Sequence, residues 1–355
     1  MKIFSGSSNK PLAQNSAKEL GIEVSPLEIF VFPDGERRIR VVDSVVDEKT
    51  VVFQSTSTPP DQNYMELFFI ADALKRSGAS TVTAVIPYLG YERQDHVFRD
   101  GEAVSLEVIV KTLERVGVDK LVAFDLHSVK VPELFTIPVL HLSALDLFAE
   151  KIREIAGSAL RSPSRLNEFS DASTPAELGA RSPSATLMKT SSRGKTPRAS
   201  DIETNRQSSI VNRQSFVLVS PDMGGIRRIK MLSESLGNMP YATVEKNRNL
   251  ETGDISDSSM KGDVNGKTSI IVDDMISTGR TIVAAEKILL KNGVKNILVF
   301  ATHAVFSANA VKLLENLKAE KVFVTDTIFI PEEKYFDKLE VISVSKTIAE
   351  GLKRF

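Results

Sequence analysis

Residues 270–285, IIVDDMISTGRTIVAA, decide the fold and the position of the binding site. An apolar run leads into two acids, Asp273 and Asp274, then into the polar run 277–281 and a stretch with helical spacing. This order predicts a strand, a turn and a helix. In parallel α/β sheets, ligands bind beyond the carboxyl ends of strands, where helix N-termini offer free N–H groups to phosphate. Small hydroxylated residues around a glycine let the backbone amides surround an anion.

The two adjacent acids distinguish a binding loop from an ordinary capped turn. Taken alone, the run 277–281 also fits a helix start with a Ser or Thr cap. Like charges placed side by side at a strand end are costly without a ligand. The acids therefore favour a binding role, with carboxylates placed to accept hydrogen bonds from sugar hydroxyls.

The same alternation of strands and helices extends along most of the chain. Short β-branched runs predict strands at 50–54, 81–87, 121–125, 216–220, 269–273, 296–302 and 321–325. Amphipathic stretches predict helices at 64–77, 105–116, 223–236 and 281–292. Several predicted strands are apolar throughout, as is typical of strands covered on both faces. We therefore predict an α/β fold with mostly parallel sheets.

Composition narrows the class of protein. The 355 residues, 42% hydrophobic and 26% charged, are enough for two globular domains. The net charge of -1 gives no general attraction to nucleic acid or to a membrane surface, so we expect neither as a partner. The absence of cysteine excludes disulfides and thiolate zinc sites. The N-terminus lacks the apolar core of a signal peptide, and no apolar run approaches about 18 residues, so we expect a cytoplasmic protein.

One segment interrupts the alternation. Residues 158–214 are rich in Ser, Thr, Arg and Pro, are almost free of aromatic residues and show no sustained period. Such a segment cannot bury enough apolar surface to offset its ordering entropy, so we predict a disordered insertion. Its removal would join a helix ending near Ile155 to the strand 216–220 and leave about 300 residues, which is two domains of ordinary size.

Four further motifs stand at predicted turns or strand ends. They are FPDGE at 32–36, YERQD at 91–95, FDLHS at 124–128, and SPDMGG at 220–225 with EKNR at 245–248. Each alone fits a plain structural role. Asp34 and Glu36 could decorate a turn, His127 could be a buried histidine, and Arg93 could be a surface cation.

Taken in order with the loop 277–281, the motifs resemble those of ribose-phosphate diphosphokinases over essentially the whole chain outside the insertion. The run 98–102, FRDGE, is more similar to archaeal-type members. The resemblance implies two phosphoribosyltransferase-like domains related by a pseudo-twofold. We expect residues 1–145 to carry the ATP-binding motifs. Residues 146–355 would carry the ribose 5-phosphate loop, interrupted by 158–214.

The resemblance also implies the activity and the residues that carry it. The reaction would transfer the diphosphoryl group of ATP to the C1 hydroxyl of ribose 5-phosphate, with Mg²⁺, in a homo-oligomer. Lys246 and Arg248 would be catalytic, and His127 and Asp222 would bind the metal. ATP would be bound by Asp34, Gly35, Glu36, Arg93 and Gln94. Ribose 5-phosphate would be bound by Arg248, Asp273, Asp274, Ser277, Thr278, Gly279, Arg280 and Thr281. Arg280 departs from the family pattern, which has a small residue there, usually Gly.

Two alternatives stay open at this point. A type I phosphoribosyltransferase would need only the loop 277–281, and it leaves the motifs around His127, Arg93 and Lys246 unexplained. A catalytically silent regulatory paralogue of the synthase is the second alternative. The presence of His127, Lys246 and Arg248 argues against it.

We predict that the activity does not need the insertion. Replacing residues 158–214 with a short Gly-Asn turn should leave magnesium-dependent synthase activity within a few-fold of the parent. In the parent, the segment should show fast backbone hydrogen exchange and protease sensitivity. The segment is either a passive insert or a regulatory segment, since Ser and Thr lie beside basic residues at 161–164, 181–184 and 195–200, and under either reading the catalytic core does not need it. Lost activity or solubility on deletion, or strong exchange protection, would contradict the prediction.

Overall fold

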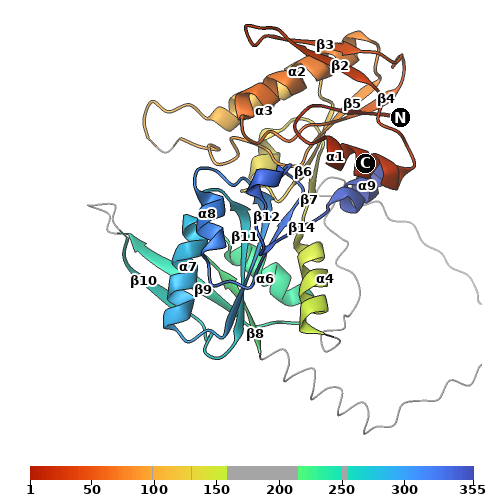
Figure 1. Ribbon diagram of the computed structural model, residues 1–355. Helices are drawn as coiled ribbons and strands as arrows, with labels where there is room; N and C mark the ends of the chain where they lie inside the picture. The colour runs from red at the N-terminus through yellow and green to blue at the C-terminus, as the bar shows by residue number, and fades with distance from the viewer. Residues whose placement is uncertain (98, 129, 158–214, 249–254) are drawn as a thin grey trace, which may run out of the picture.

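The computed structural model describes residues 1–355 except 98, 129, 158–214 and 249–254. The chain folds into two α/β halves, and each half is built on one twisted sheet with helices against its faces (Figure 1). Most strands are apolar along their length because both faces of each sheet are covered. Within the described residues, no helix is both long and apolar enough to cross a membrane.

The first half contains a parallel sheet in the order β1-β4-β5-β6-β7. Its strands are β1 (Lys2–Ser5), β4 (Lys49–Phe53), β5 (Thr81–Ile86), β6 (Lys120–Phe124) and β7 (Val139–Leu142). Its helices are α1 (Lys10–Leu20), α2 (Pro60–Arg76), α3 (Ser105–Arg115), the short η1 (Val131–Leu134) and α4 (Leu145–Ala156). A separate antiparallel hairpin, β2 (Leu27–Val31) and β3 (Arg37–Val41), packs on α2.

The second half contains a larger sheet in the order β10-β9-β8-β11-β12-β13-β14. Its strands are β8 (Phe216–Ser220), β9 (Tyr241–Arg248), β10 (Ile255–Lys261), β11 (Thr268–Ile276), β12 (Asn296–Ala304), β13 (Lys321–Thr325) and β14 (Leu339–Ile342). Its helices are α6 (Ile226–Ser235), α7 (Arg280–Lys291), α8 (Ala310–Glu315), the short η3 (Glu332–Lys334) and α9 (Ser345–Arg354). All pairs are parallel except the edge pair β9–β10.

The second half repeats the order of elements of the first. In each half a strand and a helix come first, then a hairpin, then parallel strands separated by helices, and then a final helix. The sheet order β8-β11-β12-β13-β14 corresponds to β1-β4-β5-β6-β7. This repeat, and the parallel sheets, confirm the predicted fold of two α/β domains of one type.

The final helix of each half packs on the sheet of the other. Phe148 and Ile152 of α4 lie in one core with Leu218 of β8 and Ile270 of β11. Ile348 of α9 lies in another core with side chains from α1, β1 and β4. Figure 1 shows the yellow-green α4 among the elements of the second half and the dark blue α9 beside the red α1. The two halves are therefore joined by a reciprocal exchange of helices.

The structure contains the predicted strands and helices, and it adds elements that the sequence did not reveal. Missed strands are β1, β2, β3, β7, β9, β10 and β14, and missed helices are α1, α8 and α9. Part of the polar stretch 247–267 forms β10, which pairs with β9. The predicted insertion, residues 158–214, lies outside the described residues.

Buried polar contacts join the two halves where their sheets meet. The carboxylate of Asp125, just after β6, accepts hydrogen bonds from Ser143 Oγ (2.6 Å), Ala144 N (2.9 Å) and Thr302 Oγ1 of β12 (2.6 Å). Asn9 Nδ2 donates to the carbonyl of Asp326 at 2.7 Å. These bonds satisfy polar groups that the junction between the halves would otherwise bury unpaired.

His303 of β12 lies at this junction and is fully buried. Its ring is 5.0 Å from the Tyr88 ring of the first half, in an edge-on arrangement, and its Nδ1 is 3.0 Å from Thr327 Oγ1. Burial lowers the pKa of His303 to about 4. The folded protein therefore holds this imidazole neutral at physiological pH.

We predict that His303 makes the protein less stable as the pH falls below the ordinary histidine range. Between about pH 6.5 and pH 4, the His303 imidazole is protonated in the unfolded chain and neutral in the folded protein. This difference lowers the free energy of unfolding by up to about 3 kcal/mol. The loss should be complete near pH 4 and absent above about pH 7. Chemical denaturation of the parent and of His303→Gln across this range measures it. A slope that persists unchanged in the variant would contradict the assignment.

Candidate active site

The carboxyl ends of β6 and β11 bring a histidine and two acids together from the two halves. His127 follows β6, and Asp273 and Asp274 lie in the last part of β11. The Nδ1 atom of His127 is 2.7 Å from Oδ2 of Asp274. The side chain of Asp274 is 9% exposed and that of His127 is 44% exposed, so the pair opens to solvent on the histidine side.

A guanidinium lies against both acids. Arg228 of α6 is 3.9 Å from Oδ1 of Asp273 and 3.7 Å from Oδ2 of Asp274. Burial and the neighbouring Asp274 raise the pKa of Asp273 well above its usual range. Burial also acts to raise the pKa of Asp274, but the hydrogen bond from His127 and the charge of Arg228 outweigh it and lower that pKa. The pair is therefore split into one carboxylate that ionises readily and one that does not.

The imidazole of His127 takes its charge from this arrangement. The hydrogen bond to Asp274 raises the pKa of His127, and burial opposes that rise. The main-chain N–H of His127 donates to Oε2 of Glu92 at 3.1 Å. Glu92 is 1% exposed, and burial raises the pKa of its carboxyl well above the usual range. The His127 ring, which is cationic or hydrogen-bonded to Asp274, is thus held at the edge of a cluster of acids formed by Glu92, Asp273 and Asp274.

The predicted phosphate loop follows directly from this cluster. β11 ends at Ile276, Gly279 adopts the left-handed conformation with φ 77°, and α7 begins at Arg280. Only glycine takes this backbone conformation without strain. The first amides of α7 have no partner within the helix, and they carry its positive dipole end. Ser277 Oγ is 2.9 Å from Ser307 Oγ, which ties the loop to the turn after β12.

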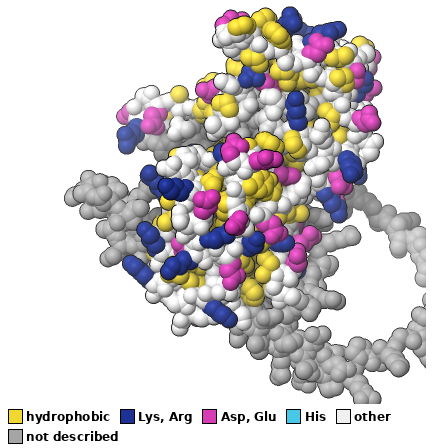
Figure 2. Space-filling model, viewed as in Figure 1, with side chains coloured by type: hydrophobic (Ala, Val, Ile, Leu, Met, Phe, Trp, Pro, Cys, Tyr) yellow, Lys and Arg dark blue, Asp and Glu magenta, His cyan; other side chains and the backbone are white. Residues whose placement is uncertain are grey.

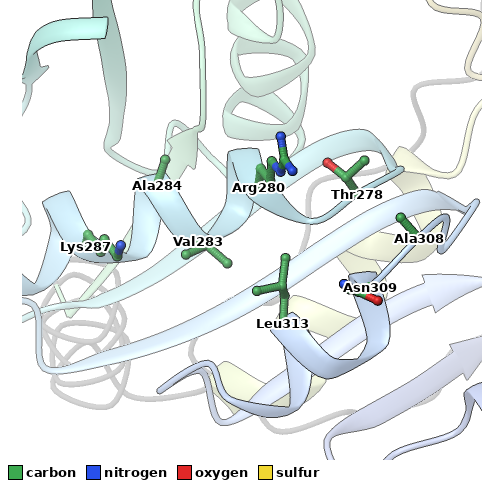
Figure 3. A pocket seen from close by; sticks show the side chains of 8 residues that line it. All are labelled: Thr278, Arg280, Val283, Ala284, Lys287, Ala308, Asn309 and Leu313. Carbon is green, nitrogen blue, oxygen red and sulfur yellow. The ribbon is translucent and has the colours of Figure 1, made fainter.

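The structure shows where the unexpected Arg280 goes. Arg280 is exposed and lines a cavity of about 440 Å³ beside the loop. Figure 3 shows residues of the loop and of α7 along one flank and residues at the start of α8 across from them. The lining residues are Thr278, Arg280, Val283, Ala284, Lys287, Ala308, Asn309 and Leu313. The side chain of Arg280 is therefore exposed and borders this cavity, next to the predicted phosphate loop.

Asp222 turns its carboxylate toward its own loop. Its Oδ1 accepts hydrogen bonds from Gly224 N at 3.0 Å and Gly225 N at 3.3 Å, before α6 begins. Among the described residues, no three His, Asp or Glu side chains lie close enough to hold a metal ion by themselves. His127 and Asp222, the predicted metal ligands, therefore do not form such a group of three among the described residues.

The ATP motifs lie on two separate elements. Arg93 and Gln94 are exposed in the turn after β5, close in sequence to Glu92. Asp34, Gly35 and Glu36 form the exposed tip of the β2–β3 hairpin, where Asp34 Oδ1 accepts the Glu36 N–H at 3.1 Å. Figure 1 shows this hairpin on the outer side of α2, away from the ends of β6 and β11. Within one chain, Asp34, Gly35 and Glu36 therefore lie on the outer surface, away from the strand ends that carry His127 and Asp274.

Lys246 and Arg248 lie on β9, opposite β10. Lys246 pairs with Ser258 and Arg248 with Ile255 in an antiparallel register. The side chains of both residues lie outside what the structure describes. Their backbones place them on an edge hairpin that corresponds, in the order of elements, to the hairpin carrying Asp34 and Glu36.

Sequence reasoning missed two residues of the cluster, Arg228 and Glu92. Arg228 had a weak signal, because it lies in the first turn of a predicted helix that follows the SPDMGG motif. Glu92 lies in the YERQD motif, where the family resemblance pointed to Arg93 and Gln94, and an acid in a polar turn is normally solvated. Its burial depends on contacts with the strand end that carries His127.

Comparison with known proteins identifies the family. Residues 1–117 match the model of the N-terminal domain of ribose phosphate pyrophosphokinase, and residues 238–355 match that of the phosphoribosyl synthetase-associated domain. Ribose-phosphate pyrophosphokinase 1 of Streptococcus mutans is 33% identical over an alignment that covers all of this chain and 93% of the relative. The chain belongs to the ribose-phosphate pyrophosphokinase family. The predicted family and the predicted enzyme activity are thereby confirmed.

Further relatives agree over the same length. The ribose-phosphate pyrophosphokinase of Aquifex aeolicus is 32% identical over all of this chain and 95% of the relative. The crystal structure of phosphoribosylpyrophosphate synthetase from Mycobacterium smegmatis superposes with a TM-score of 0.79 at 30% identity, covering 99% of this chain and 97% of that one. A likeness that spans both halves is what a pyrophosphokinase requires, whereas a phosphoribosyltransferase would need the second half alone.

Proposed function

We propose that the cluster of His127, Asp273, Asp274 and Arg228 is the place where this pyrophosphokinase transfers the diphosphoryl group of ATP to ribose 5-phosphate. The C1 hydroxyl of the sugar attacks the β-phosphorus, and AMP leaves. The observation that carries the proposal is the 2.7 Å contact between His127 and Asp274, which joins the two halves beside the phosphate loop. Transfers of this kind depend mainly on positioning and on stabilising charge on phosphoryl oxygens.

The loop 277–281 would hold the sugar phosphate. Amides at the start of α7 and the hydroxyls of Ser277, Thr278 and Thr281 offer donors to its 5-phosphate. Asp273 and Asp274 lie directly before the loop and would accept hydrogen bonds from the ribose hydroxyls. Arg280 would add positive charge from the outer side of α7.

The acidic cluster suits Mg²⁺. Burial, and then the neighbouring Asp274, raise the pKa of Asp273, so a cation beside these acids would favour its ionised form. His127 and Asp222 would help hold the ion, with water and substrate oxygens completing its shell, as Mg²⁺ prefers. When bound, Mg²⁺ neutralises charge on the phosphate oxygens. The protein's own residues orient the substrate, and His127 and Arg228 keep Asp274 ionised.

Lys246 and Arg248 would place positive charge beside the diphosphoryl group while it is transferred. Their strand lies next to the edge strand β10, and the part that carries them pairs with β10 beyond its pairing with β8. An edge hairpin can approach a bound substrate without disturbing the sheet core. From there, the two cations would stabilise the transferring diphosphoryl group.

A direct assay tests the proposal. Purified protein should release AMP from ATP only when ribose 5-phosphate and Mg²⁺ are both present. Lys246→Ala should lower kcat by orders of magnitude and leave the KM values nearly unchanged, because the lost charge acts in the transition state. Lys261→Ala, on the same hairpin, is the matched control and should behave like the parent. AMP release without ribose 5-phosphate, or a Lys246→Ala variant with parental kcat and a raised KM for ATP, would contradict the proposal.

The position of the hairpin motif supports a homo-oligomer. Phe30, Val31 and Phe32 are 48%, 50% and 36% exposed beside the tip that carries Asp34 and Glu36. Figure 2 shows hydrophobic side chains exposed at the top of the molecule, with acidic and basic side chains among them. A second copy would cover these apolar residues.

We therefore predict that the protein in solution has at least twice the mass of one chain. Light scattering across a concentration series measures that mass. Phe30→Asp should shift the protein toward the mass of one chain, because it places a charge in the covered surface. Arg40→Asp on β3, where the side chain is already exposed and paired with Glu28, is the control. A parent protein with the mass of one chain at every concentration would contradict the prediction.

A further inference from the structure

The carboxylate of Glu92 is buried beside the reacting groups and is only half used. Its Oε2 accepts the main-chain N–H of His127 at 3.1 Å, and its Oε1 is buried with no hydrogen-bond partner among the described residues. Its electrostatic neighbours are Asp274, Arg228 and Arg93. A buried acid with an unpartnered oxygen costs stability, so its presence calls for a reason in function.

The turn that delivers Glu92 is tightly determined. Gly90 donates to Thr56 Oγ1 at 2.8 Å and accepts from the Tyr64 hydroxyl at 2.8 Å, and a Cβ on Gly90 would lie 2.4 Å from the carbonyl oxygen of Thr56. The next residue, Tyr91, has φ 65°, which is uncommon for a residue with a side chain. Such conformations persist where the surroundings over-determine them, and they gather at functional sites. Here the turn directs Glu92 inward.

Each of the first three main-chain N–H groups after β6 donates a hydrogen bond. Asp125 N donates to the Leu142 carbonyl at 2.9 Å, and Leu126 N donates to His141 Nε2 at 3.0 Å. The next amide, that of His127, is held by Glu92. Glu92 thus holds the backbone of His127 from the first half, while Asp274 holds the ring from the second half.

We propose that Glu92 is a positioning residue for the transfer reaction, since its carboxylate fixes the main chain of His127 and so sets the imidazole against Asp274. The inference rests on the proposed role of His127 at the site. A misplacement of about 1 Å at a reacting group can cost about a hundredfold in rate. Glutamine at this position keeps an oxygen that accepts the N–H, whereas alanine removes the acceptor.

The test compares Glu92→Ala with Glu92→Gln. Glu92→Ala should lower kcat by about ten- to a hundredfold and raise the Mg²⁺ concentration needed for half-maximal rate, with little change in the KM for ribose 5-phosphate. Glu92→Gln should recover most of the kcat. Asp326→Ala and Asp326→Asn are the matched controls, because Asp326 accepts the Val344 N–H at 2.8 Å after β13 in the same way. Both controls should keep the parental Mg²⁺ dependence.

A second readout does not depend on activity. The chain has four histidines, so protein labelled with ¹⁵N-histidine gives few amide signals, and His127→Asn assigns one of them. The His127 amide should exchange slowly in the parent and in Glu92→Gln, and faster in Glu92→Ala. Equal protection in all three proteins, or loss of activity in Glu92→Gln as large as in Glu92→Ala, would overturn the proposal. An inactive parent with the predicted exchange pattern would instead refute the proposed function, and it would show that Glu92 holds the His127 backbone without serving a transfer reaction.

Discussion

The exchange of final helices is the constraint on which the rest of the structure depends. Phe148 and Ile152 of α4 help to close the core of the second sheet, and Val344 and Ile348 at α9 help to close that of the first. Separating the halves would expose both cores, at a cost of roughly 25 cal/mol per Å² of apolar surface. The two sheets are therefore held in one relative orientation. That orientation places the end of β6 against the end of β11, where His127 meets Asp274.

The two halves differ in how the loop after their first strand is held. In the first half, the loop after β1 is closed by a carboxylate from α2: Glu66 accepts from Ser7 N at 2.6 Å and from Gln54 Nε2 at 3.0 Å, and it pairs with Arg37. Glu286 of the corresponding helix α7 instead accepts the Lys318 N–H. The loop after β8, which corresponds to the loop after β1, is therefore not closed by a carboxylate of α7. The two halves share one fold but differ in how this loop is held.

The sequence predicted what local patterning controls. Apolar strands such as β5 and β12, and the strand-turn-helix around Asp273 and Gly279, were found because burial on both faces and a left-handed glycine have local signatures. Strands of four residues such as β1 and β7 carry too little period to detect. The β9–β10 hairpin has no such signature, because most of its residues are polar, as edge strands often are. The inward position of Glu92 and the place of Arg228 depend on contacts between distant segments, which no local pattern encodes.

The proposed function also explains why the buried charges of the cluster are tolerated. Glu92, Asp273 and Asp274 lie close together with Arg228, and isolated buried carboxylates are costly. A core chosen for stability alone would replace them with apolar residues, as buried ion pairs often can be. Under the proposed function, a substrate that brings phosphates and a divalent cation would change this balance, because the cation would pair with the acids and the phosphates would pair with the amides of α7. The same negative charge that weakens the free protein would then favour the loaded site. The buried charges lower the stability at the junction of the halves, and the packing of the exchanged helices α4 and α9 compensates for that loss.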